Sequence, residues 1–234
     1  MKRVHLKAGA LTAPLPPVLV TVGDEEKSNI ITIGWTGILS TIPPRTYISV
    51  RPERYSHSLL TEHGEFVINL TTDKMAWAVD YAGIYTGAKV DKWRECALTP
   101  AKSKCVAPPT VAESPLALEC RVIEVRNMGT HDVFIADIVS VSCDESILDS
   151  KGRIELDRAG LLAYAHGEYF ALGEKLGKFG FSTNKNEKRQ KNATRVAKMA
   201  ARADKKEPKE ESTDKKQPFY VTAPGYKGKR GKRK

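Results

Sequence analysis

The sequence contains no apolar run close to the ~20 residues that a membrane-spanning helix needs, which excludes a conventional transmembrane segment. Its four cysteines have no CxxC spacing and its five histidines are scattered, so no zinc site is recognisable. The late glycines do not form a GxGxxG motif, and no strand-to-helix pattern surrounds them. A Rossmann-type dinucleotide-binding domain is therefore not expected.

The cysteines and the N-terminal stretch both favour a cytoplasmic protein. A chain of 234 residues, 41% of them hydrophobic, can bury a sizeable core without disulfides. We therefore expect free thiols at Cys96, Cys105, Cys120 and Cys143, with disulfide pairing as the alternative. The first residues carry positive charge, but Pro14, Pro16 and Pro17 interrupt the apolar region that a signal peptide would need.

The excess of positive charge is confined to the end of the chain. Residues 182–234 carry 18 Lys and Arg against 6 Asp and Glu, whereas residues 1–181 carry 20 against 22. The last segment has few large apolar side chains and cannot bury enough surface to fold alone. We predict a folded domain over residues 1–181 and a basic, disordered tail over residues 182–234. The tail either only aids solubility or binds nucleic acid or another polyanion, weakly and with strong salt dependence.

The pattern of residues 29–69 predicts the order strand, tight crossing, strand, short helix, strand. The strands are apolar and β-branched or alternate in polarity. They are expected at residues 30–35, 46–51 and 65–70. Pro43 and Pro44 interrupt the chain before the second strand, and the helix begins at Ser56 and ends at Gly64.

The rest of residues 1–181 adds more strands and one helix, so the fold class is mainly β. Further strands are expected at residues 17–22, 116–127, 131–143, 161–164 and 169–172. Residues 74–85 have helical spacing, with Trp77 and Tyr81 on one side, where we expect packing in the core or in a dimer. Charges on the long hairpin, such as Glu119 and Glu124, are interpreted as solvated cross-strand charges and not as an acid–base pair.

The turn before the short helix carries the chemistry of this segment. A helix N-terminus offers free N–H groups and partial positive charge, and Arg51, Arg54 and the proposed N-cap Ser56 lie beside it. These donors suit a phosphate, and the apolar strand end at Trp35 suits an aromatic ring. Together they describe a mononucleotide site. The alternative is a capped surface helix with two solvated arginines.

The runs NIITIGWTG, PPRTYISVRPERYSHSLL, GEFVINL, AKVDKW and GEYFALGE, in this order, resemble the flavin reductase-like family and within it the flavoredoxin-type proteins. The resemblance covers residues 1–181. It implies an FMN-binding split β-barrel with Greek-key connections and short flanking helices. It also implies noncovalently bound FMN and a homodimer with the flavin sites at the subunit interface.

The resemblance also assigns the cofactor's polar parts. Arg51, Ser56 and His57 would hold the phosphate, together with N–H groups of the turn at Ser56. Asn29 and Ser49 would face the ribityl chain or the edge of the ring.

The same resemblance also implies which residues contact the flavin ring. The backbone of Trp35 and Thr36 would meet the isoalloxazine, with the Thr36 hydroxyl as a donor. Lys92 would meet a polar edge of the cofactor, unless it is an exposed loop lysine. His166 would lie near the flavin edge with a catalytic role, unless it is structural.

The resemblance implies an FMN-binding oxidoreductase, and NAD(P)H is the expected electron donor. Hydride transfer to a flavin needs no Ser–His–Asp set and no metal, because the cofactor carries the chemistry. Without a Rossmann domain, a nicotinamide nucleotide would bind over the flavin. The first alternative is a flavoredoxin-like electron carrier with a redox protein as partner. The second is a nucleic-acid-associated protein that acts through its basic tail.

Overall fold

The computed structural model describes residues 2–183 and 196–199 of the chain. The chain divides into two units, Met1–Gly173 and Glu174–Lys234. The predicted basic tail lies almost entirely outside the described residues, so its boundary, its disorder and its binding to polyanions stay predictions. Among the described residues, no helix is both long enough and apolar enough to cross a membrane.

Strands dominate the first unit, as the sequence pattern predicted. The strands are β1 (Val18–Gly23), β2 (Ser28–Ile33), β3 (Thr36–Thr41), β4 (Pro44–Val50), β5 (Glu65–Asn69), β6 (Pro100–Ala101), β7 (Thr110–Val111), β8 (Leu116–Asn127), β9 (Asp132–Cys143), β10 (Leu162–Ala165) and β11 (Glu168–Ala171). The helices are α1 (Tyr55–His63), α2 (Ala76–Ile84) and α3 (Lys92–Glu95). Short 3-10 turns follow at η1 (Asp73–Met75), η2 (Glu145–Ile147), η3 (Leu156–Arg158) and, in the second unit, η4 (Phe181–Thr183).

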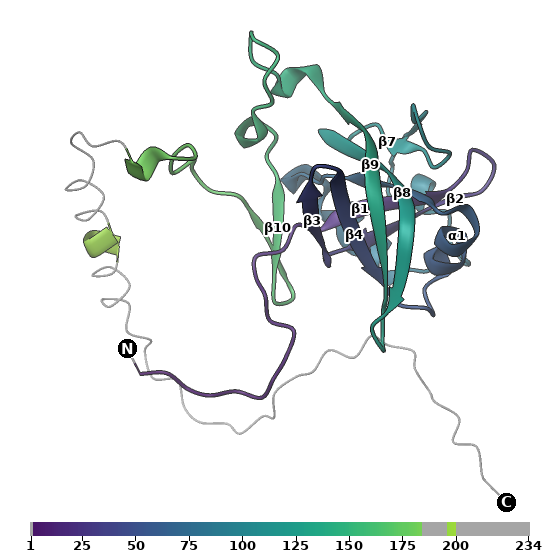
Figure 1. Ribbon diagram of the computed structural model, residues 1–234, viewed down its shortest axis with the longest axis horizontal. Coiled ribbons are helices and arrows are strands. Elements are labelled where there is room, and N and C mark those ends of the chain that lie inside the picture. Colours follow the sequence, from purple (N-terminus) through teal and green to yellow (C-terminus); the bar gives the residue numbers. More distant parts are fainter. Residues whose placement is uncertain (1, 184–195, 200–234) are drawn as a thin grey trace, which may run out of the picture. The chain divides into compact units, whose positions relative to one another are not determined.

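The main sheet has seven strands in the order β2-β1-β5-β8-β9-β4-β3. Every neighbouring pair in it is antiparallel. The long β8–β9 hairpin lies between β5 and β4, so strands from the start and the middle of the chain share one sheet (Figure 1). This strand order departs from the sequence order in the manner of a Greek key. The short pairs β6–β7 and β10–β11 form separate sheets.

The segment after β2 is a strand and not the tight crossing that the sequence suggested. β3 pairs antiparallel with β4 and forms one edge of the main sheet. Its neighbouring residues Ile38 and Leu39 are 63% and 52% exposed. The register of β3 and β4 shifts between Ile38 and Ser40, and Leu39 has no partner residue there. With two neighbouring apolar side chains exposed, the segment lacks the alternation by which a half-buried strand is recognised.

The main sheet is buried on both faces at β1, and each face supplies an apolar cluster. Val20, Phe66 and Phe134 belong to the cluster that includes Leu60 of α1. Side chains of α2 pack on the other face, in a cluster that includes Leu19 of β1. Successive β1 side chains therefore alternate between two cores, as the twofold period of a strand requires.

The predicted helix over residues 74–85 is confirmed as η1 and α2, but its aromatic side chains do not all enter the core. Trp77 is 63% exposed, so core packing is wrong for this residue. Its ring stacks on Tyr81 with a centroid distance of 5.0 Å, and Tyr81 stacks on Tyr85 at 4.3 Å. Packing of these rings in a dimer stays a prediction.

Glu119 is buried, in contrast to the solvated position that was predicted for the charges of β8. It is 2% exposed, and its carboxylate accepts hydrogen bonds from the backbone N–H groups of Lys104, at 3.0 Å, and Cys105, at 2.5 Å. On the same strand, Glu124 is exposed and pairs with Arg126. Glu119 thus attaches the loop before β7 to the sheet.

We expect Glu119→Ala to lower the free energy of unfolding by about 2–4 kcal/mol, because two charge-assisted hydrogen bonds are lost and two N–H groups lose their acceptor. Urea denaturation followed by tryptophan fluorescence measures this change. The matched control is Glu124→Ala, whose exposed ion pair contributes less than about 1 kcal/mol. An equal loss of stability in the two variants would contradict the structural role of Glu119.

Candidate functional site

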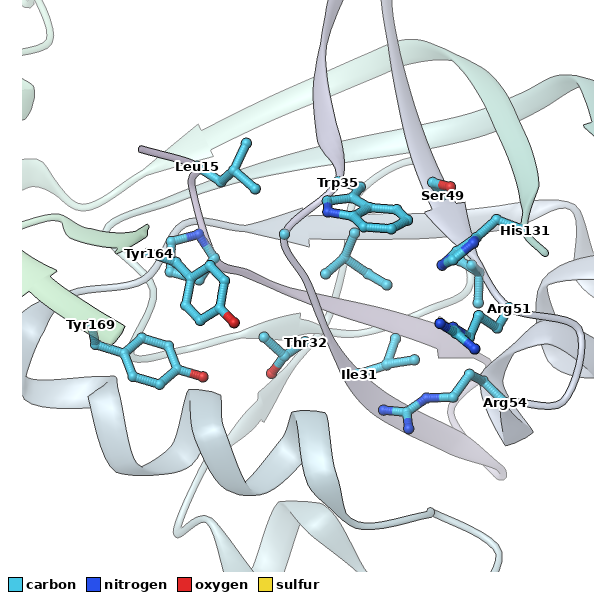
Figure 2. Close-up of a pocket in the computed structure, with 14 residues that line it drawn as sticks. Leu15, Ile31, Thr32, Trp35, Ser49, Arg51, Arg54, His131, Tyr164 and Tyr169 are labelled. Carbon is cyan, nitrogen blue, oxygen red and sulfur yellow. The ribbon is translucent and has the colours of Figure 1, made fainter. Parts of the chain in front are cut away.

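A cavity of about 300 Å³ opens where β2 and β4 end. Segments that are far apart in the sequence form its walls: the residues before β1, the turn before α1, the β8–β9 connection and the β10–β11 hairpin. Figure 2 labels the side chains that define it, which are Leu15, Ile31, Thr32, Trp35, Ser49, Arg51, Arg54, His131, Tyr164 and Tyr169. Of the predicted site residues, Trp35, Ser49 and Arg51 line this cavity.

Three basic side chains, Arg51, Arg54 and His131, gather at one end of the cavity (Figure 2). The Arg54 guanidinium donates a hydrogen bond to the carbonyl of Gly83 in α2. Burial, and next the charge of Arg51, lower the pKa of both Arg54 and His131. Because burial and the charge of Arg51 disfavour a positive charge on Arg54 and His131, an anion placed among the three would be favoured.

The helix α1 begins one residue before the predicted N-cap, Ser56. Arg54 occupies the N-cap position and makes no side-chain capping bond, so the N-cap prediction for Ser56 is wrong. Ser56 is 1% exposed, and its Oγ accepts a hydrogen bond of 2.7 Å from Nδ2 of Asn29. Asn29 and Ser56 therefore join β2 to α1 and do not line the cavity. The first N–H groups of α1 have no side-chain cap beside the two arginines.

His57 does not line the cavity and holds the β8–β9 hairpin. Its Nε2 lies 2.7 Å from Oδ2 of Asp132, and its ring packs edge-on against Phe134 at 5.3 Å. Asn127 donates a second hydrogen bond to the Asp132 carboxylate, and these hydrogen bonds lower the pKa of Asp132, with the Asn127 bond the larger cause. Asp132 follows His131 directly, so His57 places His131 in the cavity wall.

Trp35 forms one wall of the cavity between β2 and β3. Its ring lies 4.5 Å from that of His131, at an interplanar angle of 43°. Its carbonyl accepts a hydrogen bond of 3.0 Å from the N–H of Ser49, which fixes the two predicted residues beside each other. The Thr36 hydroxyl donates to the carbonyl of Tyr47 at 2.6 Å, and Thr36 does not line the cavity.

Lys92 is buried behind the cavity, so the alternative of an exposed loop lysine is wrong. It is 3% exposed, and its Nζ donates hydrogen bonds of 2.8 Å to the carbonyls of Ile30 and Ala82. Burial, and next the charge of Arg54, lower the pKa of Lys92 to about 8. The ammonium does not line the cavity; it ties β2, which forms the cavity floor, to α2.

His166 lies in the exposed turn of the β10–β11 hairpin, with a positive φ of 50°, and does not line the cavity. Tyr164 and Tyr169 lie opposite each other on the two strands, and both line it. The hairpin does not join the main sheet; Leu15 and Tyr164 bond through their backbones at 2.8 and 2.9 Å. The sequence signal in this segment was the tyrosine pair flanking the turn, since residues opposite each other share one face.

The chain is similar to proteins of known structure over most of its length. A family model described as a flavin reductase like domain matches residues 11–173. The flavoredoxin of Desulfovibrio vulgaris (Miyazaki F) is 32% identical, with 78% of this chain and 100% of that chain covered and a TM-score of 0.73. An FMN-binding protein from Thermus thermophilus, solved with 1-cyclohex-2-enone, is 29% identical, with 76% and 99% covered and a TM-score of 0.64.

The predicted fold is confirmed by these similarities. A flavin reductase with a split barrel domain from Shewanella frigidimarina NCIMB 400, whose assignment as a reductase is provisional, is 20% identical, with 72% of this chain and 86% of that chain covered and a TM-score of 0.65. At this identity the likeness concerns the fold alone. The mainly β sheet with its Greek-key order and short helices is thus a split barrel.

The buried ammonium of Lys92 predicts a characteristic pH dependence. Its pKa is about 8 in the folded state against 10.5 for an unperturbed lysine, so the unfolded chain binds more protons between these values. Stability should therefore rise with pH through this window. Relative to Lys92→Met, the wild type should gain about 2 kcal/mol in unfolding free energy between pH 7 and about pH 9.5.

Denaturant titrations of both proteins at several pH values measure this difference, because all other titrating groups are shared. A difference that does not change with pH would show that the Lys92 ammonium is not destabilised in the fold.

Proposed function

Because the chain belongs to the flavin reductase-like family, we propose that it is an FMN-dependent oxidoreductase whose cofactor occupies the cavity beside Trp35. The observation that carries the proposal is the polarity of this cavity. Basic side chains gather at one end, and the floor and the other end are apolar and aromatic (Figure 2). The similar protein from Thermus thermophilus is described as FMN-binding, which supports the choice of flavin.

The donors at the basic end fit a phosphate monoester. Arg51, Arg54 and His131 supply charged or polar N–H groups, and the uncapped start of α1 supplies backbone N–H groups. His57 would act on this end indirectly, because its hydrogen bond to Asp132 holds the hairpin that carries His131. Ser56 and Asn29 would support α1 from the interior.

The middle of the cavity fits a planar heterocycle. Ile31 and Thr32 form the floor, and the Trp35 indole, 42% exposed, offers an aromatic wall. Ser49 lines the cavity beside this wall, bonded to the Trp35 carbonyl and two residues before Arg51, and a ribityl chain would pass here. Lys92 would hold the floor strand in place from behind.

The protein's residues bind and orient the reactants and exclude water from them. When bound, FMN supplies the acceptance and donation of a hydride. NAD(P)H is proposed as the hydride donor, and its nicotinamide would enter the same cavity, since the sequence offers no GxGxxG motif. Holding two rings in contact accounts for most of the protein's contribution to such a reaction.

A flavoredoxin-like electron carrier is the second candidate, and the similarity to the Desulfovibrio vulgaris flavoredoxin favours it. The two candidates differ in their response to nicotinamide nucleotides. Stopped-flow mixing of the FMN-loaded protein with NADH or NADPH separates them. Rapid bleaching of the flavin by either nucleotide supports the reductase, and slow bleaching by both supports a carrier that depends on a protein partner.

A homodimer with the flavin near the interface is part of the proposal. The exposed side chains of Ile38 and Leu39 on the edge strand β3, close to the partly exposed Trp35, support a partner surface beside the cavity. Light scattering coupled to size exclusion measures the mass in solution. A monomer at micromolar concentration would contradict this part of the proposal.

The cofactor itself is tested by the absorption spectrum of the purified protein and by a fluorescence titration with FMN. A flavin spectrum, or binding of added FMN, supports the proposal. A colourless protein that does not bind FMN would overturn it.

We expect Arg51→Ala to weaken FMN binding about ten- to a hundredfold, because a charge-assisted hydrogen bond to phosphate is worth roughly 1.5–3 kcal/mol. Quenching of flavin fluorescence measures the dissociation constant. Arg45→Ala is the matched control: Arg45 lies on β4, the strand that Arg51 directly follows, but it pairs with Asp137 and does not line the cavity. Unchanged affinity in Arg51→Ala would refute the phosphate position.

A further inference from the structure

Two tyrosines form the end of the cavity that lies away from Arg51 and Arg54 (Figure 2). Tyr164 of β10 and Tyr169 of β11 are directly opposite in the hairpin, with ring centroids 5.3 Å apart and an interplanar angle of 59°. Figure 2 shows both phenol groups directed into the cavity. Nothing in the proposed hydride transfer uses these hydroxyls.

The two hydroxyls differ in what they can offer to a ligand. Tyr169 donates its O–H to Oδ1 of Asp80 at 3.2 Å, so its oxygen keeps lone pairs that can accept a hydrogen bond. Burial, and next the charge of Asp80, raise the pKa of Tyr169, so this phenol keeps its proton. Among the described residues, no group pairs with the Tyr164 hydroxyl, so its O–H can donate. The pair therefore presents one donor beside one acceptor.

We propose that Tyr164 and Tyr169 form a recognition site for an amide edge, in which a carbonyl and an N–H group lie side by side. Tyr164 donates to the carbonyl, and Tyr169 accepts from the N–H. This proposal rests on the proposed function, and it states which part of the ligand the tyrosine end of the cavity binds. The proposed function involves two ligands with such an edge. In FMN the edge is the pyrimidine side of the flavin ring, and in NAD(P)H it is the carboxamide of the nicotinamide.

Other ligand groups fit this end less well. A carboxylate or phosphate has no N–H for the Tyr169 oxygen and would lie near the negative charge of Asp80. A simple ketone or ester would satisfy Tyr164 only and leave Tyr169 without its donor. The neutral amide edge satisfies both hydroxyls, and the arginines at the far end take the phosphate.

The variants Tyr164→Phe and Tyr169→Phe test the site, because each removes one hydroxyl and keeps the ring. The matched control is Tyr85→Phe, since Tyr85 is exposed at the end of α2 and does not line the cavity. Two quantities are measured for each protein: the dissociation constant of FMN and the KM for NADH. Thermal melting curves confirm that the variants fold.

The two ligand sources give different results. If the flavin edge is bound, each variant weakens FMN binding about three- to tenfold, as the loss of one neutral hydrogen bond predicts. If the carboxamide is bound, FMN affinity is unchanged and the KM for NADH rises by a similar factor. Ligand analogues test whether Tyr169 accepts a hydrogen bond from the ligand, because each analogue lacks the donor. 3-Methyl-FMN lacks the flavin N–H, and the 3-acetylpyridine analogue of NADH lacks the amide NH₂. The wild type should discriminate against the relevant analogue, and Tyr169→Phe should lose that discrimination.

Unchanged FMN affinity and unchanged KM in both folded variants, with a wild type that binds FMN, would overturn the amide-edge site and leave the proposed function standing. A wild type that binds no FMN would overturn the proposed function and this inference with it.

Discussion

The hydrogen bonds of the buried Lys92 ammonium hold together the two elements on which the cavity depends. One bond reaches Ile30 of β2, the strand that forms the floor, and the other reaches Ala82 near the end of α2. Arg54 donates to the next carbonyl, Gly83, so two cations neutralise the C-terminal end of this helix. The position of the basic end of the cavity relative to its floor therefore depends on these two cations. The two carbonyls offset only part of the cost of burying the Lys92 ammonium, because its pKa is lowered to about 8.

The local pattern of apolar and polar residues was enough to predict the helices and strands that bury one face or both faces. The bounds expected for β8, residues 116–127, agree with the structure, and the helical spacing at residues 74–85 identified α2. β3 could not be predicted in the same way, because its apolar residues are exposed at the sheet edge. The pattern of a strand arises from burial, and an edge strand without a covered face does not show it.

The site was predictable where its residues are neighbours in the sequence, as Arg51 and the start of α1 are. His131 reaches it because β9 pairs with β4, and the two tyrosines reach it because the backbone of Tyr164 bonds to Leu15. The tyrosine pair is visible in the sequence, but no local motif records these two long-range contacts. The type of a residue also does not reveal which groups its side chain contacts in the fold. His57 and Lys92 have the chemistry of cofactor ligands, but the fold turns them toward Asp132 and toward two carbonyls.

The cavity wall runs from Leu15 to Tyr169, and so it draws on nearly the whole first unit. Residues 31–54 supply most of the lining, but they surround a cavity only when the residues before β1, the β8–β9 connection and the β10–β11 hairpin are folded against them. An unfolded chain would therefore have almost no affinity for the cofactor. Binding of a ligand in the cavity and folding of the chain are therefore linked by mass action. A ligand present at a hundred times its dissociation constant adds about 2.7 kcal/mol to the free energy of unfolding. If FMN is the ligand, as proposed, the supply of FMN would then influence how long the folded protein survives in a cell.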